Sequence, residues 1–160
     1  MKGLIALGTG LMMMSSLVCA HEVVVKVSLS PAGSFEAKSA KVKGDVKKTG
    51  NSFTAENLWV KTEELKTGIT LRDEHFHKHL NFEKFPKIAF TQVSAADGKG
   101  SGTLVINDIK KVVPFTYKAS GANKVEATFK VKPSDFKLKE AKYMEIGVED
   151  EVEVVALIDV

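Results

Sequence analysis

Cysteine is nearly absent from this chain of 160 residues, and arginine is equally scarce. Cys19 is the single cysteine, and it lies in an N-terminal run that we predict to be removed. The remaining chain would then have no disulfide and no thiol nucleophile. Its stability must therefore come from a hydrophobic core, for which a chain of this length is sufficient.

The sequence also lacks a strong excess of charge of either sign. It has 23 Lys and Arg residues against 20 Asp and Glu residues, and loss of Lys2 with the N-terminal run would narrow this difference. The basic residues are spread along the chain instead of forming one cluster. This pattern is typical of a solvated surface and not of a nucleic-acid interface, so we expect no nucleic-acid partner.

The N-terminus has the pattern of a secretory signal peptide. Lys2 is followed by an apolar run over residues 4–14 and by small residues that end at Ala20. Cleavage after Ala20 would remove residues 1–20 and leave one domain, residues 21–160, in the periplasm or secreted. A retained membrane anchor is a weaker alternative, since the run is short for a span. A lipoprotein centred on Cys19 is also weaker, because Val18 is bulky for the residue before a lipidated cysteine and Ser16 stands where leucine is usual. No later apolar segment is long enough to cross a membrane.

Strands dominate the predicted structure. Residues 22–30 alternate, with their valines on one face, and residues 124–132 alternate most regularly. Further strands are expected at residues 36–47, 53–62, 88–95, 102–107, 111–120 and 149–159. Regular hairpins without a long helix predict an all-β protein, in which about eight antiparallel strands form a closed barrel. The interior of such a barrel either encloses a ligand or is filled by side chains.

One short helix is predicted near residues 71–80, where it would cover one mouth of the barrel. Thr70 and Asp73 resemble a capping box, and Pro86 prevents the helix from continuing far. We expect Asp73 to cap this helix and Arg72 to pair with a carboxylate.

Three of the four histidines lie on this predicted helix. His75 and His79 are four residues apart and could share a metal ion, whereas His77 points elsewhere. A third ligand would have to come from Asp73, Glu74 or a distant strand. We therefore predict no metal site. A periplasmic metal-binding or stress-related protein that uses His75, His77 and His79 remains the alternative function.

The sequence offers no recognisable catalytic group. The serines lie in turns or strands without a nucleophile motif around them, and residues 98–102 form a glycine-rich hairpin turn and not a phosphate loop. We expect no enzymatic activity and no cofactor other than a bound lipid.

Aromatic side chains are the remaining signal, because eight of them could line an apolar cavity inside a barrel. For any single ring, the alternative is that it packs in an ordinary hydrophobic core. The ligand-binding residues that we predict are Trp59, Phe76, Phe90, Phe115 and Phe129 along the cavity, with Arg72 and His75 beside a polar head group.

Five blocks of sequence carry a family resemblance. They are TGITLRDEHF at residues 67–76, FEKFPKIAFT at 82–91, GTLVINDIKKVVPF at 102–115, FKVKPSDFKL at 129–138 and GVEDEVEVVALI at 147–158. In this order they resemble the YceI-like family of periplasmic polyisoprenoid-binding proteins. The resemblance implies a lipocalin-like barrel with a long-chain lipid inside, such as a quinone or a prenyl lipid. It also implies a role as a carrier or store of that lipid, and it leaves open whether the chain forms a homodimer.

Overall fold

The computed structural model describes residues 21–139, 141–143 and 146–160. The predicted signal peptide at residues 1–20 lies outside the described residues. Within the described ranges, no helix is both long enough and apolar enough to span a membrane.

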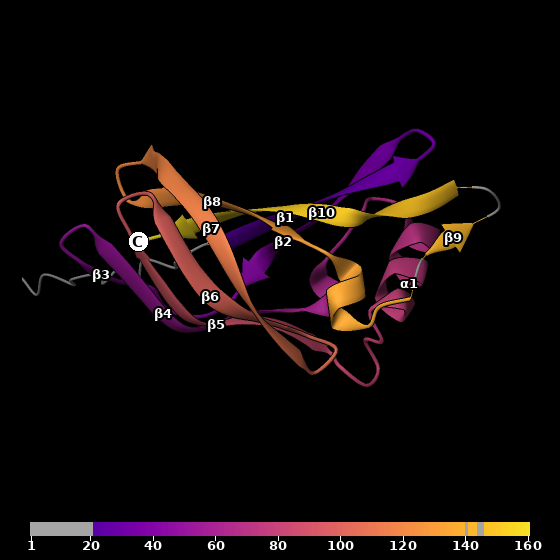
Figure 1. The fold of residues 1–160 in the computed structure, drawn as a ribbon, viewed down its shortest axis with the longest axis horizontal. Coiled ribbons are helices and arrows are strands. Elements are labelled where there is room, and N and C mark those ends of the chain that lie inside the picture. The colour runs from indigo at the N-terminus through magenta and orange to yellow at the C-terminus, as the bar shows by residue number, and fades with distance from the viewer. Residues whose placement is uncertain (1–20, 140, 144–145) are drawn as a thin grey trace, which may run out of the picture.

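One antiparallel sheet makes up most of the described chain (Figure 1). Its ten strands are β1 (His21–Ser30), β2 (Ser34–Val42), β3 (Lys47–Thr49), β4 (Ser52–Lys61), β5 (Lys87–Ala96), β6 (Lys99–Ile106), β7 (Ile109–Gly121), β8 (Lys124–Val131), β9 (Lys142–Tyr143) and β10 (Ile146–Asp159). The order across the sheet is β2-β1-β10-β8-β7-β6-β5-β4-β3, and β9 pairs with the start of β10. The hairpins place strands that are adjacent in sequence side by side, as the alternating pattern predicted.

The two edges of the sheet, which are formed by β2 on one side and by β4 and β3 on the other, approach each other without forming a continuous ladder of hydrogen bonds. Lys43 and Trp59 exchange two backbone hydrogen bonds of 2.8 and 2.9 Å, and Lys38 and Lys66 exchange another two of 2.8 and 2.9 Å. Both contacts are isolated bridges between the β2 side and the β4 side. The sheet is therefore a half-barrel of ten described strands whose edges meet at two points, in place of the predicted closed barrel of about eight strands.

The predicted strand at residues 36–47 is interrupted in the structure. Gly44 separates β2 from β3 with a φ of +126°, in the region that only glycine adopts readily. A Cβ at this position would overlap the carbonyl oxygen of Asn57. The buried His21 ring donates from Nε2 to the carbonyl oxygen of Gly44 at 3.0 Å, which fixes this break against β1.

The single α-helix, α1 (Thr70–His79), agrees with the predicted helix within one residue at each end. It ends because Asn81 adopts a left-handed conformation with a φ of +51°, several residues before Pro86. Figure 1 shows α1 at the same end of the half-barrel as β9 and the start of β10.

The capping interaction at the start of α1 differs from the predicted one. Ile69 is the N-cap residue, and no side chain caps the helix. Instead, the Asp73 carboxylate accepts hydrogen bonds of 2.7 Å from the backbone N–H and from the hydroxyl of Thr67. Burial raises the pKa of Asp73, but the two Thr67 hydrogen bonds, together with the charges of Lys66 and His77, hold the pKa below its usual value. Asp73 therefore fixes the loop that leads into the helix.

The PSDF segment of the fourth sequence block, residues 133–136, has a structural role. It forms the short 3-10 helix η2 (Pro133–Phe136), and a second 3-10 helix, η1 (Thr62–Glu64), follows β4. The Ser134 hydroxyl and backbone N–H both donate to the carboxylate of Asp150 on β10. Phe136 is only 1% exposed and packs in the main core with Leu104, Val131 and Val152.

Candidate functional site

An apolar cavity of about 990 Å³ occupies the interior of the half-barrel. Protein interiors are otherwise close-packed, with few voids larger than a water molecule. Ligand pockets typically have volumes of about 300–1,000 Å³ and mostly apolar walls. This cavity has the volume and lining of a binding site for an apolar molecule.

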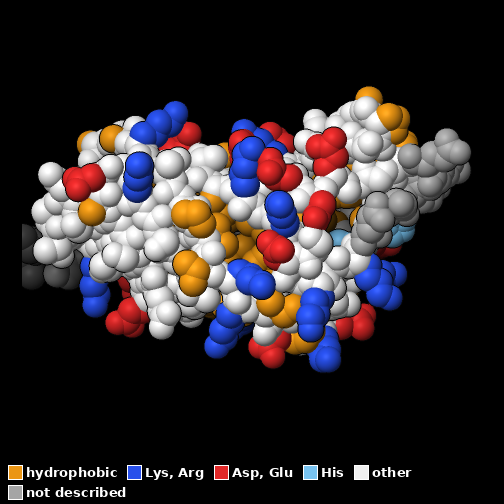
Figure 2. All heavy atoms as spheres, viewed as in Figure 1, with side chains coloured by type: hydrophobic (Ala, Val, Ile, Leu, Met, Phe, Trp, Pro, Cys, Tyr) orange, Lys and Arg blue, Asp and Glu red, His pale blue; other side chains and the backbone are white. Residues whose placement is uncertain are grey.

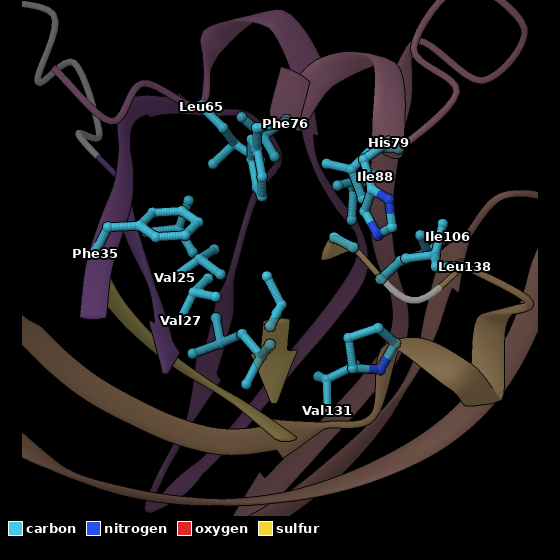
Figure 3. Close-up of a pocket in the computed structure, with 18 of the residues that line it drawn as sticks. Val25, Val27, Phe35, Leu65, Phe76, His79, Ile88, Ile106, Val131 and Leu138 are labelled. Atoms are coloured by element: carbon cyan, nitrogen blue, oxygen red, sulfur yellow. The ribbon is translucent and has the colours of Figure 1, made fainter. Parts of the chain in front are cut away.

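The cavity wall is made by the inward faces of the strands. β1 contributes Val23, Val25, Val27 and Leu29, and β10 contributes a matching row that runs from Ile146 to Ile158. At about 3.3 Å per residue, the lined part of β10 is at most roughly 40 Å long. Figure 3 shows the side chains of Val25, Val27, Ile88 and Val131 directed into one common space. The cavity is therefore elongated along the strands.

The sheet is also incompletely paired between β7 and β8, on the side opposite the two isolated bridges. The pairing of these two strands runs only from the pair Thr116 and Thr128 to the pair Gly121 and Lys124, and beyond it the strands diverge toward η2 (Figure 1). In the same view, Figure 2 shows apolar side chains in a hollow at the middle of the face, with Lys, Asp and Glu side chains around it.

Two stacked phenylalanine rings lie in the wall at the deep part of the cavity. The ring centroids of Phe90 on β5 and Phe129 on β8 are 5.4 Å apart, and the ring planes differ by 14°. Gly102 on β6 leaves room for the Phe90 ring, because a Cβ there would lie 2.8 Å from Cζ of Phe90.

Among the described residues that line the cavity, all the ionisable side chains come from α1. They are Arg72, His75, Lys78 and His79, and no described Asp or Glu is among the lining residues. Since α1 lies at one end of the half-barrel, this helix gives that end a basic and hydrogen-bonding rim. The rest of the described lining is hydrocarbon or aromatic.

The predicted ion pair of Arg72 is replaced by an aromatic contact. The Arg72 guanidinium lies 4.9 Å from the ring centroid of Phe35 on β2, and among the described side chains it forms no ion pair. Phe35 in turn meets Phe76 edge to face at 6.4 Å. Arg72, Phe35 and Phe76 thus connect α1 to β2, and Figure 3 shows both rings bordering the cavity.

The apolar rim beside this helix is exposed to solvent. Ile69 is 50% exposed, Leu71 is 62% exposed and Ile146 is 47% exposed, and all three also line the cavity. The apolar lining therefore continues to the surface at the α1 end.

The three helical histidines do not converge on one point. His77 is buried on the opposite face of α1, where its Nε2 lies 2.8 Å from the carbonyl oxygen of Leu65. His75 and His79, which are four residues apart, both border the cavity. Among the residues that the structure describes, no group of three or more His, Cys, Asp or Glu side chains is placed to hold a metal ion.

We predict that His79 makes stability depend on pH. Burial lowers the pKa of His79 below its usual value. The unfolded chain therefore takes up a proton at this histidine below about pH 6.5, before the folded chain does. The free energy of unfolding should fall as the pH is lowered through this range.

Urea unfolding of the parent protein and of His79→Gln at about pH 7.5 and pH 5.5 measures this effect. The variant should lose less stability between the two values than the parent. At about pH 8, this histidine is neutral in both the folded and the unfolded chain. The difference in free energy of unfolding between the parent and the variant should therefore no longer change with pH. An equal loss in both proteins would exclude His79 as the source.

The structure separates the predicted ligand-binding residues into two groups. Arg72, His75, Phe76, Phe90 and Phe129 all border the large cavity. Trp59 also lines this cavity, and the Nζ atoms of Lys43 and Lys87 lie 5.3 and 4.1 Å from the centroid of its ring. Phe115 is the one predicted residue that is placed differently. Phe115 is buried against Phe90, with centroids 5.9 Å apart, outside the large cavity.

Several cavity residues were not in the predicted set. The valines of β1 were predicted to form a buried face, but their alternation could not distinguish a filled core from a cavity wall. Phe35 and His79 were missed, although the four-residue spacing from His75 was a usable signal for His79.

Comparison with known proteins gives a consistent result. The family model for the YceI-like domain matches residues 15–160. Comparison with curated proteins found no match. A polyisoprenoid binding domain from Saccharophagus degradans, described as implicated in plant cell wall breakdown, has a similar structure with a TM-score of 0.60. It is 12% identical, and the alignment covers 88% of this chain and 94% of that chain.

A second similar structure is the YceI protein of Campylobacter jejuni, with a TM-score of 0.58 and 20% identity. The alignment covers 78% of this chain and 82% of that chain. A mutant of the same protein that carries a monobromobimane guest gives a TM-score of 0.59. At these identities the likeness establishes a shared fold.

Proposed function

This chain belongs to the YceI-like family, and from that premise we propose that it binds a long-chain apolar lipid of isoprenoid type inside the half-barrel. The observation that carries the proposal is the elongated cavity of about 990 Å³, which is lined by hydrocarbon and aromatic side chains. Burial of apolar area stabilises a complex by roughly 25 cal/mol per Å², so a long chain gains most from such a cavity. The similar domain from Saccharophagus degradans, described as polyisoprenoid binding, supports the same class of ligand.

The head group of this lipid would lie at the α1 end. Arg72, His75 and His79 place hydrogen-bond donors there, and no described carboxylate competes for them. A quinone carbonyl or a phosphate oxygen accepts hydrogen bonds from such donors. The exposed Ile69, Leu71 and Ile146 would guide the apolar tail into the cavity.

The protein would act as a carrier or store in the periplasm or outside the cell, without catalysis. Export is supported by the signal-peptide pattern of residues 1–20. A role without catalysis is supported by the serines of the sequence, which have no nucleophile motif around them.

Native mass spectrometry tests the proposed function. The protein purified from its own host should carry an extra mass of several hundred daltons, which organic extraction removes. Adding a prenyl quinone to the extracted protein at about 100 times its dissociation constant should restore roughly 2.7 kcal/mol of stability. A heat-denatured and refolded sample without lipid is the control. Absence of both the bound mass and the stabilisation, with isoprenoid alcohols as well as quinones, would contradict the proposal.

A further inference from the structure

A second, smaller cavity lies beyond the deep part of the large one. Its volume is about 70 Å³, and its lining includes Phe53, Phe115, Tyr117 and Ala127, which come from β4, β7 and β8. Phe53 and Tyr117 meet edge to face, with ring centroids 5.5 Å apart. This space is too small for a long chain and is lined by apolar surface, so it is expected to be dry.

A shared wall divides the two cavities. The residues that line both are Leu58, Phe90, Phe129, Ala156 and Ile158. β5 and β8 are separated in the sheet by β6 and β7, so the stacked rings of Phe90 and Phe129 meet across the interior. The two rings therefore form the central part of the partition.

The two rings are held differently. Phe90 is backed by Gly102 on β6 and also contacts Phe115. Phe129 is half-buried, borders both cavities, and has the Phe90 ring as its only aromatic partner among the described residues. Loss of the Phe129 ring would open the partition while Phe90 stays supported from behind.

We propose that the Phe90–Phe129 pair sets the length of the apolar chain that this protein accepts. This inference rests on the proposed function, because it concerns the same cavity and the same class of ligand. A chain whose tail reaches the stacked rings fills the large cavity. A longer chain must leave its end in water or displace a ring, so its added carbons gain no burial.

Phe129→Ala tests this role with all-trans isoprenoid alcohols that differ by one isoprene unit. In the parent protein, affinity should rise with chain length and then stop rising. In the variant, the length at which it stops should increase by at least one unit. The first longer alcohol should bind the variant at least about tenfold more tightly than it binds the parent, which corresponds to about 1.4 kcal/mol.

A second substitution refills the opened space. Ala127 lies two residues before Phe129 on β8 and lines only the smaller cavity. Phe129→Ala combined with Ala127→Leu should return the preferred length toward that of the parent. Phe136→Leu is the matched control, because Phe136 is buried outside both cavities and its loss should lower stability without changing the preferred length.

The outcomes separate this inference from the proposed function. If the parent binds neither the alcohols nor a series of prenyl quinones of different length, the proposed function fails and the length inference fails with it. If the parent binds them and folded Phe129→Ala keeps the same preferred length, only the length inference is overturned. Should Phe129→Ala not fold, Phe129→Leu removes part of the ring and must still shift the preference toward longer chains, and an unchanged preference there would also overturn it.

Discussion

Replacing Val25 by aspartate is expected to lower the affinity for a long-chain isoprenoid by at least about 100-fold, or about 2.7 kcal/mol. Val25 lies on β1 between Ala37 of β2 and Val154 of β10, and its side chain points into the cavity (Figure 3). A bound lipid would remove water from the carboxylate, and burial of an unpaired charge costs more than burial of a neutral polar group. Without lipid, the carboxylate can stay hydrated, because a cavity of about 990 Å³ has room for water beside it.

Val25→Thr is the matched control for this substitution, since it keeps the shape of the side chain and adds only a hydroxyl. It should weaken lipid binding much less than Val25→Asp. Titration of the extracted proteins with a fluorescent isoprenoid gives both affinities, and thermal unfolding shows whether each variant is folded. A folded Val25→Asp protein with parental affinity would mean that the lipid does not occupy this cavity.

Replacing Phe136 by alanine is expected to lower the free energy of unfolding by about 3–5 kcal/mol. Phe136 is 1% exposed and packs against the core that includes Val131 and Leu138. Its carbonyl oxygen also accepts a hydrogen bond from the Asn107 side chain at 3.3 Å. The short η2 segment therefore holds β8, β10 and the β6–β7 turn together, and no other described phenylalanine is as deeply buried.

The urea midpoint at constant slope measures the loss for Phe136→Ala. Val112→Ala is the control, because Val112 is 74% exposed and its truncation should change stability by no more than about 0.5 kcal/mol. A loss of less than about 1 kcal/mol for Phe136→Ala would show that the cavity around it collapses or that η2 contributes little to the fold.

Much of the fold could be predicted from local patterns in the sequence. Alternation of apolar and polar residues placed β1 and β8 within a residue or two, because the two faces of a strand have different environments. The helix near residues 71–80 was equally clear. The break at Gly44 was not predicted, since it depends on the approach of Asn57 from another strand. Strand β9 has only two residues, which is too short for any periodic signal.

The candidate site was predicted less completely than the fold. The sequence indicated which part of the chain would carry donors, and Arg72 and His75 do line the cavity. It did not indicate that Arg72 would lie against Phe35, because that contact joins α1 to a strand more than thirty residues earlier. It also grouped Phe115 with the cavity residues, although this ring fills the region beyond Phe90, outside the large cavity.

By itself, the sequence determined that the chain forms antiparallel strands with one apolar face each, and that one short polar helix interrupts them. Its five sequence blocks also indicated the YceI-like family. Only the tertiary structure decided that the apolar faces enclose about 990 Å³ instead of a filled core. The physical reason is that strand periodicity assigns side chains to two faces but contains no information about sheet curvature. The distance across the half-barrel, which depends on that curvature and on the contacts of Phe90 with Phe129, determines whether the facing side chains meet.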